Sequence, residues 1–202
     1  MKPHLVTRDV INGYLNAGHW TRETMLDRYH AHAVDYPDSI ACSDGENIYS
    51  WSELDVATDR LAANLIGLGL NRDATALIQI PSTCREILLR VALKKAGIIG
   101  IFTPLQWRRR ELAYVWEQID PSLVIMSSAL VKMDVSDWVD NIIDEANAGV
   151  TFGTADQRHC IDMAETPSGR WVGWDIIFKR PPEGETLNLI TERQFRFDEI
   201  SL

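Results

Sequence analysis

Apolar residues recur at every third or fourth position between residues 51 and 69, which is the spacing of one face of an α-helix. Ser50 precedes this stretch and Glu53 follows three residues later, a spacing typical of a capping box at a helix start. Gly67 provides the stop signal. The pattern therefore predicts an amphipathic helix whose buried face is made of Leu54, Ala57, Leu61, Leu65 and Leu68.

Two short strand-like runs, residues 39–43 and 47–51, come just before this helix. Between them, Asp44-Gly45-Glu46 has the composition of a tight hairpin turn. We expect a small antiparallel ribbon here.

Short apolar runs alternate with helical patterns in the following part of the chain. The runs occupy residues 75–80, 98–103 and 123–126, and helical periodicity occupies 84–96 and 108–118. Continuous apolar runs of this length fit strands that are covered on both faces, and a strand-helix-strand order brings successive strands parallel. The sequence therefore predicts an α/β fold, with layered βαβ units, a mostly parallel sheet flanked by helices, and the small β-hairpin.

The pattern is weaker after residue 127. Residues 138–143 suit a short helix and residues 150–152 a short strand, whereas the Pro and Gly content of 180–185 indicates a loop. Residues 197–202 look like the beginning of another strand.

Composition and charge exclude several classes of function. With 202 residues, 46% of them hydrophobic, the chain is long enough to bury a core. Its formal charge of −9 repels a phosphate backbone, so nucleic acid is not an expected partner. Three widely spaced cysteines fit a reducing compartment, and neither a targeting sequence nor a membrane-spanning run is found. We expect a cytoplasmic protein.

No stretch of the sequence has the Gly, Ser and Thr-rich composition that surrounds a triphosphate. Gly67 and Gly69 are expected to end one helix and Gly97 to end the next, whereas Gly100 is expected to pack within a strand. Ser82 or Thr83 is expected to cap the helix 84–96.

Other candidate residues favour structural roles. His30 and His32 would point in different directions on a helix, and His159 has no partner at ligand spacing, so no metal site is predicted. Trp171 and Trp174 are expected in the core. The acidic residues between 134 and 145 fit an exposed helix face, and no catalytic residue is predicted.

Several short motifs, in order and with matching spacing, resemble the opening of the adenylate-forming superfamily. They are residues 36–41, 44–45, 49–54, 59–65, 76–81, 92–97 and 110–114. Within that superfamily, Gly18-His19-Trp20 and residues 118–125 look most like the aryl-acid AMP ligases, such as 2,3-dihydroxybenzoate ligases, with acyl-CoA ligases close behind. The resemblance implies a helical lead-in over 1–35 and an incomplete N-terminal α/β domain over 36–202, best matched over 36–127.

The resemblance also implies a function for a longer protein. Such ligases activate a small carboxylic acid as an acyl-adenylate, using ATP and Mg, and transfer it to CoA or a carrier thiol. Residues 198–202 resemble the strand that leads into the family's phosphate loop, so the partner implied is the remainder of the ligase C-terminal to Leu202. This chain would then hold no cofactor of its own and would be inactive alone.

The one basic cluster, Arg108-Arg109-Arg110, has two interpretations. It is either a solvated helix start that pairs with Glu111 or, as the resemblance implies, a contact of Arg108 and Arg109 with a CoA phosphate. Two alternatives to the ligase fragment stay open: a non-catalytic binding module derived from the ligase fold, and one subunit of a split ligase. The sequence leaves open whether the chain forms a homodimer.

Overall fold

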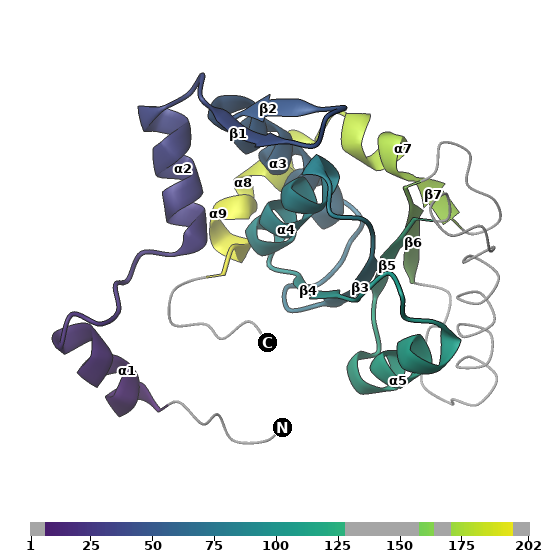
Figure 1. Ribbon diagram of the computed structural model, residues 1–202, viewed down its shortest axis with the longest axis horizontal. Coiled ribbons are helices and arrows are strands. Elements are labelled where there is room, and N and C mark those ends of the chain that lie inside the picture. Colours follow the sequence, from purple (N-terminus) through teal and green to yellow (C-terminus); the bar gives the residue numbers. More distant parts are fainter. Residues whose placement is uncertain (1–6, 128–157, 164–170, 196–202) are drawn as a thin grey trace.

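The computed structural model describes residues 7–127, 158–163 and 171–195 (Figure 1). Its helices are α1 (Arg8–Asn16), α2 (Met25–Asp35), α3 (Trp51–Ile66), α4 (Cys84–Ala96), α5 (Arg109–Ile119), α7 (Trp174–Lys179), α8 (Gly184–Asn188) and α9 (Ile190–Arg193). Its strands are β1 (Ile40–Ser43), β2 (Ile48–Ser50), β3 (Thr75–Gln79), β4 (Ile99–Phe102), β5 (Leu123–Met126), β6 (His159–Asp162) and β7 (Trp171–Gly173). None of the helices described is long and apolar enough to cross a membrane.

The predicted hairpin and the helix after it are both confirmed. Strands β1 and β2 pair antiparallel. At the start of α3, the Glu53 amide donates to the Ser50 hydroxyl at 3.2 Å, and the Ser50 amide donates to the Glu53 carboxylate at 2.9 Å. Each partner satisfies an amide that the first turn of a helix leaves without an intrahelical acceptor. Leu54, Leu61 and Leu65 are fully buried on the predicted face.

The main sheet has five strands in the order β4-β3-β5-β6-β7, and every neighbouring pair is parallel. Its first three strands confirm the predicted α/β fold. Strands β6 and β7 were not predicted, because runs of four and three residues that contain Asp162 and Gly173 carry too little periodicity.

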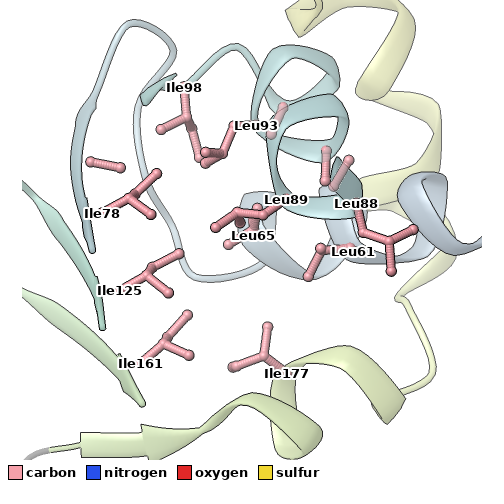
Figure 2. Packing of buried hydrophobic residues seen from close by; sticks show 14 of the residues in the cluster. Leu61, Leu65, Ile78, Leu88, Leu89, Leu93, Ile98, Ile125, Ile161 and Ile177 are labelled. Carbon is pink, nitrogen blue, oxygen red and sulfur yellow. The ribbon is translucent and has the colours of Figure 1, made fainter. Parts of the chain in front are cut away.

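Two hydrophobic clusters cover the two faces of this sheet. On one face, Ile78, Ile125 and Ile161 from neighbouring strands meet leucines of α3 and α4 and Ile177 of α7 (Figure 2). On the other face, Leu112 and Trp116 of α5 pack on the strand residues that alternate with those of the first cluster. The period of two along each strand therefore divides its apolar residues between two layers. Trp174 lies in the first cluster and Trp171 in the second, which confirms their core role.

Strand β4 differs from the prediction in its burial. The apolar run 98–103 was expected to be covered on both faces, yet all four residues of β4 are only half-buried. The reason is its place at the edge of the sheet, where among the described residues it pairs with β3 alone. Three further predictions, for residues 138–143, 150–152 and 197–202, concern segments outside the described residues.

A buried ammonium group joins the helices on the first face. Lys95 of α4 is 6% exposed, and its Nζ donates to Asp55 at 2.7 Å, to Asp59 at 2.7 Å and to Thr58 at 2.9 Å, all on α3. His30 of α2 contacts the other Asp55 oxygen at 3.2 Å. Burial acts to raise the pKa of Asp55, but the hydrogen bond and charge of Lys95, with His30, outweigh it and lower that pKa below its usual value.

Replacing Lys95 should therefore weaken the fold strongly. In Lys95→Met, Asp55 loses its cation while it stays largely buried, and we expect the free energy of unfolding to fall by about 3 kcal/mol in urea titrations at pH 7. The matched control is Lys179→Met, because Lys179 forms an exposed pair with Asp175 four residues away. That change should cost about 0.5 kcal/mol or less. Equal losses of unfolding free energy in the two variants would contradict the stabilising role assigned to the buried Lys95 ion pair.

Candidate functional site

The carboxyl ends of the parallel strands gather polar side chains at one edge of the sheet. Gln79, Thr103, Ser127 and Asp162 end or follow β3, β4, β5 and β6, and each is at most 7% exposed. In open parallel sheets, ligands bind in the crevice outside this edge. The edge is therefore where a functional site would be built.

Gln79 fixes the loop that leads from β4 to α5. Its Nε2 donates to the carbonyl of Pro104 at 2.8 Å and to that of Trp107 at 3.1 Å. Thr103 holds the start of the same loop, because its hydroxyl donates to the Ile78 carbonyl at 2.9 Å. Both anchors lie on or beside β3, so the start of α5 has a defined position next to the carboxyl end of that strand.

The predicted basic cluster begins at that anchored point. The Arg108 guanidinium folds back onto the loop, donating from Nη1 to the Leu105 carbonyl at 2.6 Å and to the Trp107 carbonyl at 3.0 Å. The Arg108 amide donates to Glu111 at 3.0 Å. That hydrogen bond and the Glu111 amide, then the charges of Arg110 and Arg108, lower the pKa of the Glu111 carboxyl. Glu111 thus caps α5 in addition to offsetting positive charge, and Arg108 and Arg109 remain exposed to solvent.

The start of α4 is occupied by a carboxylate from the hairpin. Thr83 takes the N-cap position, which confirms one of the two predicted cap residues, but its side chain makes no capping hydrogen bond. Instead, the Cys84 amide donates to Asp44 Oδ2 at 2.9 Å. The other oxygen, Oδ1, accepts from the amides of Asn47 at 2.8 Å and Glu46 at 3.1 Å. These hydrogen bonds, led by that from Cys84, hold the pKa of Asp44 far below its usual range.

This arrangement bears on phosphate binding. The turn from β3 into α4 is the strand-to-helix turn at which many nucleotide folds place a phosphate on free helix amides. Here an internal anion, Asp44, already lies on the first amide of the helix. The residues around this turn therefore do not fit the triphosphate of ATP.

The glycines also have structural roles. Gly67 and Gly97 follow the last residues of α3 and α4, and Gly97 has a positive φ of 69°. Gly100 lies in β4, where an added Cβ would approach the Leu93 side chain to 2.9 Å. Helix ending and strand packing, as predicted, explain them.

The cysteines and histidines form no reactive centre in the part of the chain that the structure describes. All three cysteines are buried free thiols. Burial first, then a hydrogen bond with Cys42, raises the pKa of Cys84 to about 12, so its thiolate is scarce at neutral pH. His30 contacts Asp55 whereas His32 contacts the Arg28 carbonyl, and no three potential metal ligands gather within the described segments.

Comparison with known proteins gives a consistent set of matches. The sequence pattern of the family described as AMP-binding enzyme matches residues 29–183. Pseudomonine synthase PmsE of Pseudomonas entomophila (strain L48) is 32% identical over 120 residues, which are 59% of this chain and 20% of that protein. The 2,3-dihydroxybenzoate-AMP ligase of Bacillus subtilis (strain 168) is 30% identical over 121 residues, 60% of this chain and 22% of the ligase.

A solved structure agrees in fold. The apo structure of Mycobacterium smegmatis MbtA matches with a TM-score of 0.75 at 21% identity, covering 88% of this chain and 31% of that one. The chain spans about a fifth of the length of the two curated relatives, at 20% and 22%.

The Asp44 cap predicts a pH-dependent loss of stability in Asp44→Asn. Because the folded-state pKa of Asp44 lies below its unfolded value, its stabilisation is complete above about pH 4 and is lost as the pH falls further. We expect Asp44→Asn to lower the melting temperature at pH 7, and the gap from wild type to narrow below pH ~4. The control is Asp38→Asn, because Asp38 is exposed. A gap that stays constant between pH 7 and pH ~2.5 would contradict this role.

Proposed function

Because the chain belongs to the AMP-binding enzyme family, we propose that it is the N-terminal portion of an ATP-dependent ligase that activates a carboxylic acid as an acyl-adenylate. The acid is then transferred to CoA or to a carrier thiol. The observation that carries this proposal is the family match over residues 29–183, which includes all five described strands of the main sheet and the helices α3, α4 and α5 that cover its two faces.

An aryl acid is the proposed substrate class. It rests on the names of relatives, which include a 2,3-dihydroxybenzoate-AMP ligase and a salicylate adenylyltransferase. The second of these is also named a salicylyl-CoA synthase, which keeps CoA among the proposed acceptors. In the intact ligase, residues outside this chain would bind the aryl ring.

We further propose that residues 36–202 are part of one α/β domain and that residues 1–35 form its helical lead-in. Capping fixes the second helix of the lead-in, because Thr24 and Asp27 bond reciprocally at the start of α2. His30 then links α2 to Asp55 of α3. In the proposed ligase, this chain would act as a scaffold, because its buried polar groups hold loops and helices in place.

ATP and Mg would be held by the remainder of the ligase. Asp44 occupies the start of α4, and the sequence holds no Gly, Ser and Thr-rich phosphate loop. The chain by itself should therefore give no ATP-pyrophosphate exchange with 2,3-dihydroxybenzoate or salicylate, whereas the Bacillus subtilis ligase serves as the positive control. Clear exchange by the 202-residue chain would overturn the proposed inactivity.

The same proposal requires a Gly, Ser and Thr-rich segment in frame shortly after the codon for Leu202. A polypeptide extended through that segment and the residues after it should catalyse the exchange. A stop codon directly after Leu202 would instead favour the non-catalytic module or the subunit of a split ligase.

Arg108 and Arg109 are proposed to contact a phosphate of CoA. They are exposed at the start of α5, beside the carboxyl edge of the sheet, where Gln79 anchors the preceding loop. In calorimetric titrations with CoA, Arg108→Ala and Arg109→Ala should each weaken binding by about tenfold. Arg60→Ala, an exposed arginine on α3, is the control and should bind as the wild type does. Identical weak or absent binding in all four proteins would dismiss the contact.

A further inference from the structure

Two of the three cysteines are far apart in the sequence but lie together in the structure. Cys42 belongs to β1, and Cys84 is the first residue of α4. Both lie in the hydrophobic cluster on the first face of the sheet, whereas Cys160 of β6 lies in the cluster on the opposite face. The fold therefore forms one cysteine pair and separates the third cysteine from it by the sheet.

The two thiols of the pair are in direct contact. Cys42 and Cys84 share a side-chain hydrogen bond. The Cys84 thiol also donates to the Asn47 carbonyl, with a sulfur-to-oxygen distance of 3.6 Å, and the Cys84 amide donates to Asp44. Because Asp44 and Asn47 belong to the turn of the β1–β2 hairpin, these hydrogen bonds tie the start of α4 to the hairpin that carries Cys42.

Burial opposes the charged form of these thiols but not a bond between them. Cys42 is 8% exposed and Cys84 is 1% exposed. In both thiols, burial is the main cause that raises the pKa, because a buried thiolate is poorly solvated. A disulfide carries no charge, and its sulfur atoms are about 2 Å apart. Two thiols in hydrogen-bond contact need only a short approach to reach that distance.

We propose that Cys42 and Cys84 form an intramolecular disulfide when a small disulfide oxidant acts on the folded chain. The bond would join the β1–β2 hairpin covalently to the start of α4, beside the hydrogen bond between Asp44 and the Cys84 amide. Cys160 would stay a free thiol, because the sheet lies between it and the pair. This proposal is independent of the ligase activity.

The reaction is a thiol–disulfide exchange in two steps. In the first, the thiolate of one cysteine attacks a sulfur of the oxidant, whose S–S bond breaks and releases one small thiol. In the second, the thiolate of the other cysteine attacks the protein sulfur of this mixed disulfide and releases the second small thiol. Two electrons pass from the protein to the oxidant, and the two cysteine protons end on the released thiols.

The exchange is expected to be slow. Both sulfur atoms are buried, and thiols with a raised pKa supply little thiolate. An oxidant reaches them only when the hairpin moves away from α4 for a short time. We therefore expect the folded chain to oxidise over a period on the order of hours.

Disulfide mapping of the 202-residue chain tests the proposed pair. The folded protein is incubated with excess cystamine at pH ~8, the remaining thiols are blocked with N-ethylmaleimide in urea, and the peptides are identified by mass spectrometry. We expect a disulfide between Cys42 and Cys84, with Cys160 carrying the maleimide. The chain oxidised in urea should instead give a mixture of all three pairings.

Three results would overturn the proposal. They are maleimide on all three cysteines after prolonged oxidation, cystamine adducts that do not close to a disulfide, and the same mixture of pairings from the folded and the unfolded chain. Cys160→Ser is the matched control and should form the disulfide as the wild type does. Cys84→Ser should leave Cys42 without a disulfide to another cysteine. If Cys84→Ser fails to fold, the peptide map of the wild type decides.

Thermal unfolding tests whether the disulfide fits the native fold. The bond closes a loop that contains β2, α3 and β3, and such a loop restricts the unfolded chain. The oxidised wild type should therefore melt about 5 °C or more above the reduced protein, and dithiothreitol should reverse the shift. An equal or lower melting temperature would show that the bond forms only with distortion of the fold, which would overturn a native disulfide at this position.

Discussion

The buried ammonium of Lys95 is the constraint on which the helical layer depends. A charge that is 6% exposed is tolerated only with its hydrogen bonds satisfied, and these partners all lie on α3. The requirement fixes α4 against α3 in rotation and along the axis, which leucine contacts alone leave less defined. His30 extends the same network to α2. One polar cluster thus gives three helices a single arrangement over the sheet.

A fixed helical layer lets polar groups from distant segments meet in a defined way. Asp44 of the hairpin reaches the first amide of α4, and α3, which follows the hairpin, is held to the same helix by Lys95. Asn64 of α3 donates to the carbonyls of Ile177 and Arg180 at 2.7 and 2.9 Å, which secures the end of α7. Arg72 donates to the carbonyl of Arg193, and Arg193 donates to the carbonyl of Leu70, so the end of α9 is held against the loop that follows α3. The result is a scaffold whose buried polar residues bind the chain itself.

Local patterns predicted local structure well. The capping box at Ser50, the helix end at Gly97 and the apolar runs of β3 and β5 are each encoded within a few residues. The Asp44 cap could not be predicted, because it joins residues 40 apart and its sequence signal is that of a hairpin turn. The exposure of β4 was also missed, since strand order is a tertiary property that an apolar run does not carry. At the candidate site, the arginines were visible as a cluster, but the anchoring by Gln79 was not.

Strand order also links the fold to the proposed chemistry. A parallel sheet directs all its carboxyl ends to one edge, so each added strand extends the same crevice. In the described residues, that edge is supplied with buried anchors and exposed arginines, while its first helix N-terminus is already occupied by Asp44. The start of α4 therefore offers no free first amide to a phosphate group. The proposed ligase would therefore combine the anchors that hold this edge with phosphate-binding amides from residues outside the described strands.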